Sequence, residues 1–281
     1  MVTTNGDRIL SSNVSLVLFG SFARQEFVEG SDYDWSLLID GGVDKDHAVI
    51  ERNISEEFKN GIHGLKAPGS SGTFGNMVFS HELVHRIGGG ADSNSNLTRR
   101  MLMLLESRPI SLSETDLSIF VWNGVLRNIL ERYFEEDIHF APNAERKVPR
   151  FLLNDLTRFW RTMAVDYAAK HQEQGREKWA LRNAKLRFSR KLLYASGVAF
   201  CMSCELNPPK KIENGLFGPI EDASVTPFID SAMQFAKTPA LEYLAAFIEE
   251  FVKDASKKKQ IAAMIFGTYS EWLELLGNKD E

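Results

Sequence analysis

Two carboxylates, Asp32 and Asp34, stand two residues apart at the head of an apolar segment, eleven residues after Ser21 of a Gly20-Ser21 pair. Because residues two apart in a β-strand point to the same side, this spacing predicts that both carboxylates share one face of a strand. The alternate positions, which would pack the core, are Trp35, Leu37 and Ile39. Carboxylates placed so closely repel each other unless protons or cations lie between them, so the pair predicts a cation site.

The segment before the pair predicts a phosphate-binding turn. Residues 14–19 are apolar and indicate a buried strand, and Gly20-Ser21 then turns the chain into a short helix beginning near Phe22. Backbone N–H groups at the start of that helix, with the Ser21 hydroxyl, would hold a triphosphate. Oxygen-only ligands suit Mg²⁺, and a two-metal site stabilises an in-line displacement at phosphorus.

The pattern from residue 18 to residue 40 resembles the nucleotidyltransferases of the DNA polymerase beta superfamily. It combines an apolar strand, the Gly-Ser turn, Ala-Arg at 23 and 24, an acidic Gly-containing turn, and Ser31-Asp32-x-Asp34 before Leu-Leu-Ile. The similarity is greatest to the bacterial signal-transduction branch related to the uridylyltransferase of the PII nitrogen regulator. The structural alternative is a hairpin with an acidic rim.

The resemblance implies an enzyme that transfers a nucleoside monophosphate from an NTP, ATP included, to an acceptor hydroxyl and releases pyrophosphate. It implies an α/β (α+β) catalytic domain with a small mixed sheet, followed by an all-α helical domain that completes the active-site cleft. Asp32 and Asp34 would bind two Mg²⁺ ions. Contacts to the nucleotide would come from Gly20, Ser21, Arg24 and Ser31. Arg24 would alternatively pair with Glu26 or Glu29.

Two further stretches extend the resemblance to about residue 193. Residues 97–110 look like the helix that follows the catalytic sheet in that branch and ends in a short acidic-Arg-Pro turn. Residues 148–163 and 179–193 resemble the helical half of uncharacterised nucleotidyltransferase-like proteins. Both are less diagnostic than the first motif.

The sequence departs from the family at the third carboxylate, which usually lies on the next core strand. That strand is predicted over residues 72–80, where the polar centre is Asn76. The nearest acid, Glu82, follows the strand end and would either complete the catalytic acids or cap a helix. If no acid fills the position, the chain would be a catalytically inactive nucleotide-sensing or interaction module.

A competing motif overlaps this segment, since residues 81–85 read His-Glu-Leu-Val-His, a literal H-E-x-x-H. His81 and His85 would share a helix face and could bind Zn²⁺, as in a zinc hydrolase. The third ligand of the longer zinc-protease motif would fall on Ala91, which has no donor atom, and Asp92 is one residue late. Glu106 is a distant candidate ligand whose Glu-Ser-Arg-Pro context favours a helix end. The alternative is that His81 caps a helix and His85 packs or contacts substrate.

Composition indicates a soluble protein: 43% of the 281 residues are hydrophobic, 25% are charged, and the formal net charge is −5. The two cysteines, Cys201 and Cys204, lack the context of a redox pair, and a zinc site with the two histidines would need remote segments to meet. So few thiols are typical of a reducing compartment. The first residues lack the features of a signal peptide, and no stretch matches a membrane span. We therefore expect a cytoplasmic protein with no membrane partner.

We expect two domains, residues 1–112 and 113–281. Residues 113–116 offer a helix capping box. The helical stripe that follows comprises Leu117, Phe120, Val121, Val125 and Ile129. A second stripe after Pro239 comprises Leu241, Leu244, Ala245, Ile248 and Val252. Residues 207–219, rich in Pro, Gly and Asn, predict a loop between them.

Basic residues concentrate in the predicted helical domain, with thirteen Lys and Arg against four acids in residues 146–191. Two helix faces result, one with Asn154, Arg158 and Arg161 and one with Lys178, Arg182, Lys185 and Ser189. They would contact the NTP, through Lys185, or the phosphates of an RNA acceptor; the alternative is a solvated face with ordinary ion pairs. The nearby aromatics Phe159, Trp160, Tyr167 and Trp179 are more typical of core than of base stacking. The acceptor is a protein, an RNA such as tRNA, or a small molecule, with a lean toward RNA or a phosphorylated acceptor.

Overall fold

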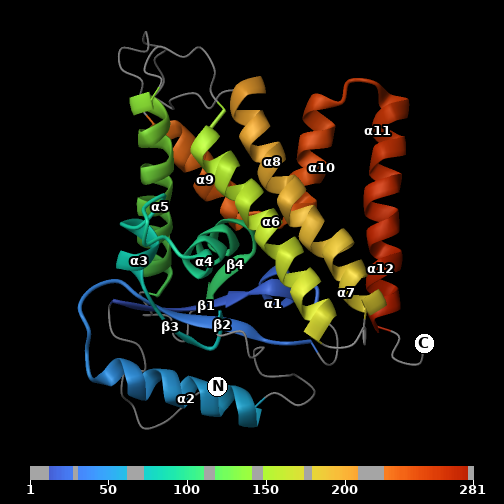
Figure 1. The fold of residues 1–281 in the computed structure, drawn as a ribbon. Helices are drawn as coiled ribbons and strands as arrows, with labels where there is room; N and C mark the ends of the chain where they lie inside the picture. Colours follow the sequence, from blue (N-terminus) through green and yellow to red (C-terminus); the bar gives the residue numbers. More distant parts are fainter. Residues whose placement is uncertain are drawn as a thin grey trace. The chain divides into compact units, whose positions relative to one another are not determined.

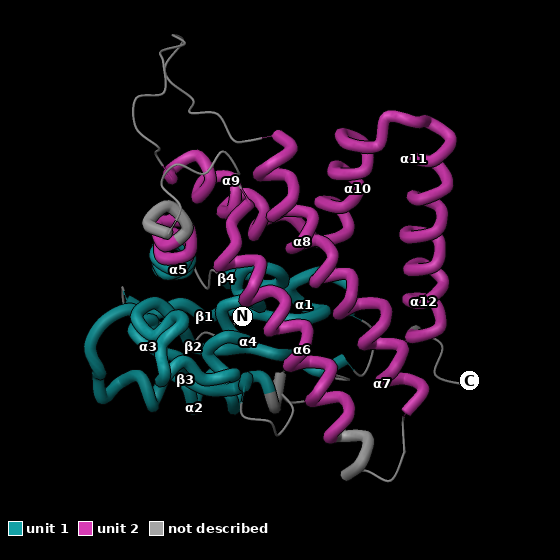
Figure 2. Tube along the Cα trace, turned by 45° about the horizontal axis from the view of Figure 1, so that its top comes forward, with its two compact units in different colours: residues 1–129 teal, residues 130–281 magenta. Residues whose placement is uncertain are grey.

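The computed structural model describes residues 13–27, 31–61, 73–110, 118–140, 148–173, 179–207 and 225–277. The chain forms two compact units, residues 1–129 and residues 130–281, which Figure 2 colours separately. The predicted division after residue 112 falls outside the described residues. Among the described residues, no helix has the length and apolar character needed to cross a membrane.

The first unit contains a four-stranded sheet in the order β3-β2-β1-β4 (Figure 1). Its strands are β1 (Val14–Phe19), β2 (Asp34–Ile39), β3 (Asn76–Phe79) and β4 (Ser107–Ile110). Strand β1 runs antiparallel to β2 and β4, whereas β2 and β3 are parallel. A small mixed sheet followed by helices was expected from the sequence and is what the structure contains. The strand predicted over residues 14–19 is confirmed.

Helices cover both faces of this sheet (Figure 1). On one face α2 (Asp46–Gly61) packs against a core cluster of Val14, Leu16, Tyr33, Trp35, Leu37, Ile39 and Ile54. On the other face lie α3 (Ser80–Val84) and α4 (Asn94–Leu105), whose Leu83 and Met103 meet Val17, Leu38 and Val78. Apolar side chains on both faces explain why β1 and β2 are nearly continuous hydrophobic runs.

The segment 97–110 differs from its predicted form. Helix α4 begins after Ser93, whose Oγ accepts the Asn96 N–H at 3.1 Å, and ends with Glu106 at its C-cap, as the Glu-Ser-Arg-Pro context predicted. The following residues are not a turn but the edge strand β4, paired with β1. Pro109 fits there because a proline, which has no N–H to donate, is tolerated on a sheet edge.

Helix α5 (Ser118–Phe140) carries the predicted stripe only in part. Val121, Val125 and Ile129 are buried, but the Phe120 side chain is 68% exposed. Each helical residue advances by about 100°, so Phe120 points away from the buried face that Trp122 and Ile129 help to form. Leu117 and the predicted capping box lie outside the described residues.

The described part of the second unit is helical. After the end of α5 come α6 (Arg150–Glu173), α7 (Trp179–Lys185), the π-helical η1 (Leu186–Arg190), α8 (Lys191–Leu206), α9 (Thr226–Lys237), α10 (Ala240–Phe251), α11 (Ala255–Ala262), the π-helical η2 (Ala263–Gly267) and α12 (Thr268–Gly277). Helix α8 packs against α6, α9 and α10, with the rings of Phe200 and Phe235 stacked 4.7 Å apart. On α10, Leu244 and Ile248 are buried as predicted, whereas Ala245 is exposed. Most of the predicted loop 207–219 lies outside the described residues.

Candidate functional site

The predicted turn and one of the predicted carboxylates lie against each other. Strand β1 ends at Phe19, which pairs with Asp34, the first residue of β2. The next residue, Gly20, has φ +68°, a left-handed conformation that favours glycine. A Cβ built on Gly20 would lie 3.3 Å from Oδ2 of Asp34. The absence of a side chain at residue 20 therefore lets the backbone approach this carboxylate closely.

Asp32 and Asp34 belong to one side of the β2 segment. Tyr33 and Trp35 are 3% and 1% exposed and both lie in the core cluster that α2 covers. Because side chains alternate along a strand, Asp34 belongs to the opposite side, and the same alternation carried back across Tyr33 places Asp32 there too. Asp32 forms an isolated bridge before β2 and is exposed, while Asp34 is half-buried. This arrangement agrees with the alternation that the sequence predicts.

The helix after the turn is short. Helix α1 (Gly20–Arg24) starts two residues before the predicted position and ends at Gln25, whose φ is +61°. Ser21 is half-buried in it, and its carbonyl accepts the Glu26 N–H at 2.9 Å. Ser31, also half-buried, directly precedes Asp32.

Arg24 takes part in an ion cluster. Its Nε donates to Glu26 at 2.8 Å, and its Nη1 donates to Glu106, the residue that ends α4. The three side chains are 12%, 13% and 10% exposed, so the cluster is largely buried. The structure thus contains the predicted pairing of Arg24 with Glu26, together with a partner that the sequence did not indicate. Glu29, the other predicted partner, lies outside the described residues.

The strand expected to supply a third carboxylate instead places Asn76 beside Ser36, its register partner on β2. Arg99 of α4 contacts this segment, since its Nη2 donates to Asn76 Oδ1 and its Nε to the Thr73 carbonyl, both at 3.3 Å. Arg99 was not among the predicted site residues. A signal was present in the sequence, because Thr98, Arg99 and Arg100 interrupt the apolar residues of the segment 97–105.

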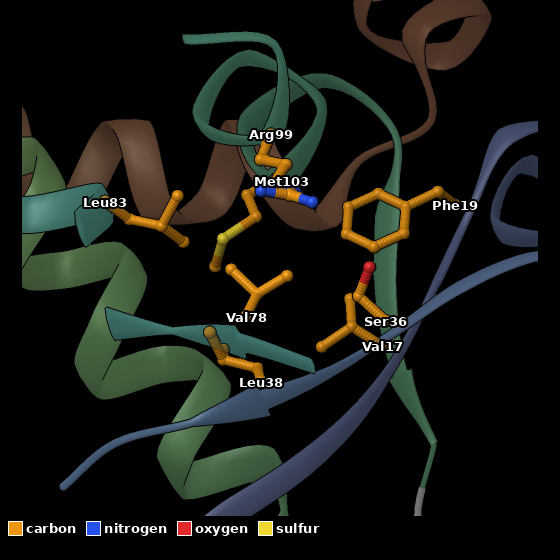
Figure 3. Close-up of a pocket in the computed structure, with 8 residues that line it drawn as sticks. All are labelled: Val17, Phe19, Ser36, Leu38, Val78, Leu83, Arg99 and Met103. Atoms are coloured by element: carbon orange, nitrogen blue, oxygen red, sulfur yellow. The ribbon is translucent and has the colours of Figure 1, made fainter. Parts of the chain in front are cut away.

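Arg99 and Ser36 are the polar members of a small cavity between the sheet and helices α3 and α4 (Figure 3). Its volume of about 10 Å³ is that of a single water, and its other lining residues are Val17, Phe19, Leu38, Val78, Leu83 and Met103. Ser36 is 4% exposed, and its Oγ has no hydrogen-bond partner among the described residues. Burial lowers the pKa of the Arg99 guanidinium, and the Glu82 carboxylate opposes that shift.

Glu82 does not complete a set of three carboxylates. It lies on α3, where its side chain is 47% exposed and pairs with Arg86 at 3.4 Å. Within the described ranges, no three His, Cys, Asp or Glu side chains gather closely enough to hold a metal ion. The structure therefore brings Asp34 to the Gly-Ser turn but does not group Glu82 with Asp32 and Asp34.

The two histidines of the H-E-x-x-H sequence are neighbours, with ring centroids 4.9 Å apart. Both are exposed, and α3 already ends at Val84. The two candidates for a third zinc ligand are engaged elsewhere, since Asp92 makes a bidentate pair with Arg100 and Glu106 pairs with Arg24. Cys201 and Cys204 are buried in α8 of the second unit, where burial raises the pKa of Cys204 to about 12.

The predicted phosphate-binding helix faces belong to the second unit. Lys185 is exposed at the end of α7, and Lys178 lies outside the described residues. Arg158 pairs with Asp155 at 2.7 Å, which also accepts the Tyr133 hydroxyl. Arg158 therefore makes one of the ordinary ion pairs that the sequence analysis offered as the alternative to phosphate contact.

The aromatic residues of the same helices divide between core and surface. Phe159 is fully buried, Trp160 stacks on Tyr194 with ring centroids 5.5 Å apart, and Trp179 is 47% exposed. The interpretation as core residues is therefore right for Phe159 and does not describe Trp179.

No protein-family model matches the chain, and comparisons with curated proteins and with solved structures found no match.

Proposed function

We propose that the chain is a Mg²⁺-dependent nucleotidyltransferase that moves a nucleoside monophosphate from an NTP to an acceptor hydroxyl. The observation that carries this proposal is the contact between the two parts of the motif. The Asp34 carboxylate lies against Gly20, on the strand beside the Gly-Ser turn, and the exposed Asp32 belongs to the same side of the β2 segment. A carboxylate pair beside a backbone turn without a side chain suits a metal-bound triphosphate.

Asp32 and Asp34 fit Mg²⁺ because both offer carboxylate oxygens, the ligands this ion prefers. The ion would neutralise negative charge on the triphosphate and the developing transition state. Gly20 would let the phosphates approach the backbone, and Ser21, Ser31 and Arg24 would add polar contacts. The acceptor oxygen forms a bond to the α-phosphorus as the bond from that phosphorus to the bridging oxygen of the β-phosphate breaks. Pyrophosphate leaves, and the proton of the hydroxyl passes to a carboxylate or to water.

The charge on two helices of the second unit favours one class of acceptor. Lys185 of α7 and the exposed Arg150 and Arg161 of α6 favour an acceptor that carries phosphate, either RNA or a phosphorylated small molecule. A protein hydroxyl is the remaining class. We place the reaction in the cytoplasm because the chain has two thiols and no disulfide bond.

A second function is favoured by Asn76, which stands where a third carboxylate was expected. An amide oxygen is a weaker cation ligand than a carboxylate, so the site would bind a nucleotide without turning it over. The chain would then be a nucleotide sensor or an interaction module. This candidate predicts NTP binding without release of pyrophosphate.

The test is incubation of the purified protein with each α-³²P-labelled NTP and Mg²⁺ in cell lysate, followed by separation of protein, RNA and small molecules. We expect label in one fraction with the wild type and none with Asp32→Ala or Asp34→Ala, since loss of a metal ligand costs several kcal/mol of transition-state stabilisation. The matched control is Glu57→Gln, an exposed acid on α2 at the opposite face of the sheet. Labelling that survives Asp32→Ala would contradict the assignment. If the protein binds a nucleotide but no fraction carries label, the result would support the nucleotide sensor over the enzyme.

A further inference from the structure

The sheet face that α3 and α4 cover is lined mostly by apolar side chains. Val17, Leu38 and Val78 lie on this face, together with Leu83 and Met103 of the helices (Figure 3). Toward the start of β2 the face becomes polar, because Asp34 and Ser36 share it and Asn76 is the register partner of Ser36. Arg99 projects from α4 to this polar end.

Two contacts fix the Arg99 side chain along the chain segment next to Asp34. The guanidinium donates to the Thr73 carbonyl and to Asn76 Oδ1. That segment runs beside the start of β2, since the Gly75 N–H donates to the Trp35 carbonyl at 2.7 Å. Neighbouring strands lie about 4.8 Å apart, so Arg99 is attached roughly one strand spacing from the residues around Asp34.

We propose that Arg99 is a phosphate-binding residue of the nucleotidyltransferase site, contacting the phosphate chain of the NTP next to the ions held by Asp32 and Asp34. This inference rests on the proposed function and adds a residue to it. Arg99 stands beside Asn76, the strand position where a third acid was expected. The site therefore supplies a fixed cation at the position where a third carboxylate was expected.

The chemistry of the group suits this role. A guanidinium presents five N–H donors in a planar fork that matches two phosphate oxygens. Partial burial strengthens its attraction for an anion, because fewer water dipoles screen the charge. Even with a lowered pKa, an arginine stays protonated near neutral pH.

The test measures equilibrium binding of MgATP, MgGTP, MgCTP and MgUTP, and of the four nucleosides, to wild type, Arg99→Gln, Arg99→Lys and Arg52→Gln. Arg52→Gln removes the same charge from an exposed position on α2. For the NTP that the wild type binds, we expect Arg99→Gln to raise Kd about 10- to 100-fold, the loss of one charge-assisted contact. Arg99→Lys should recover part of the affinity because a lysine cannot bind two oxygens as a fork. Arg52→Gln and the affinities for nucleosides should stay unchanged.

The outcomes separate this inference from the proposed function. NTP affinity that is unchanged in Arg99→Gln overturns the inference about Arg99. The proposed nucleotidyltransferase function would still stand if labelling depends on Asp34. A parallel loss of nucleoside affinity would show that Arg99 only supports the fold, and this also overturns the inference. If Arg99→Gln does not fold by circular dichroism, Arg99→Lys decides, and wild-type affinity in that variant overturns the inference. No NTP binding by the wild type overturns both.

Discussion

Gly20 faces the carboxylate of Asp34, and any side chain at residue 20 would meet Oδ2 of that carboxylate at 3.3 Å. The contact joins the end of β1 to the start of β2, two positions separated by fourteen residues in the sequence. A substitution at residue 20 would therefore be unfavourable for two reasons. The new residue would adopt an unfavourable φ of +68°, and its Cβ would press on the acid.

We predict that Gly20→Ala abolishes nucleotidyl transfer while costing about 1–2 kcal/mol of unfolding free energy. Gly88→Ala is the matched control, because Gly88 has nearly the same φ, +70°, but nothing within 4 Å of its added Cβ. In urea titrations Gly20→Ala should lose at least as much stability as Gly88→Ala, because it adds the contact with Asp34, and only Gly20→Ala should lose incorporation of label. Equal activity in the two variants would show that the contact with Asp34 has no role in the reaction.

The pair between Arg100 and Asp92 is buried and should contribute strongly to the stability of the first unit. Their side chains are 0% and 2% exposed and form two bonds of 2.7 and 2.8 Å, and Asp92 also accepts the Gly88 N–H. Asp92→Asn should cost about 3–5 kcal/mol, because it leaves a buried guanidinium without its counter-charge.

Arg86→Gln breaks the exposed pair with Glu82 in the same segment and should cost less than about 1 kcal/mol. Urea denaturation of the two variants gives the comparison. If Asp92→Asn loses less unfolding free energy than Arg86→Gln, water must reach Arg100 in the folded protein.

The Arg24 cluster predicts energetic coupling between the end of α1 and the end of α4. Arg24→Gln takes the positive charge from both Glu26 and Glu106 and should destabilise by about 3 kcal/mol, whereas Glu106→Gln leaves Arg24 paired with Glu26 and should cost about 1–2 kcal/mol. The double variant removes both charges, so its loss should fall short of the sum by about 1–3 kcal/mol. A double-mutant cycle in urea measures this coupling, and strictly additive losses would refute it.

Cys204 predicts a loss of stability at alkaline pH. Its pKa is about 12 in the folded protein and 9.0 as an ordinary thiol, so the folded state holds the proton more tightly than the unfolded state. The Cys204 thiol therefore leaves the free energy of unfolding unchanged below pH 9. Between pH 9 and pH 12 it lowers that free energy by up to about 1.4 kcal/mol per pH unit. Cys204→Ala should have a shallower decline than the wild type above pH 9 and a parallel profile from pH 7 to 8. If the wild type and Cys204→Ala lose stability with the same slope above pH 9, the Cys204 thiol ionises within the folded protein as easily as in the unfolded chain.

The burial of both cysteines predicts slow thiol chemistry. Cys201 and Cys204 are 0% and 1% exposed on α8, so a thiol reagent should reach them only when the helix opens. Ellman's reagent should therefore react slowly with native protein and at once in denaturant. Rapid reaction of the native protein would contradict the burial of these side chains.

Local pattern was enough for the elements around the candidate site. Period-two alternation predicts that Trp35, Leu37 and Ile39 face a core, and these residues lie in the cluster under α2. The strand ending at Phe19, the turn at Gly20 and the helix end at Glu106 follow from residue types that constrain the backbone within a few positions. In each case the deciding interaction lies within one turn or one strand.

Local pattern failed where a distant segment supplies the partner. Residues 107–110 look like a turn, but the free edge of β1 makes them a strand. Phe120 has the spacing of a core residue, yet the buried side of α5 lies on the opposite face.

The sequence by itself therefore predicts the turn at Gly20, the apolar strands and the alternation that sets the two acids on one side. These features depend only on φ preferences and on the period of a strand. Only the folded structure determined which partner each charged side chain contacts. Arg24 meets Glu106 across 82 residues, and Arg99 reaches Asn76 across 23. A charged side chain takes whichever partner the packed layers bring within about 3 Å, and no local spacing encodes that distance.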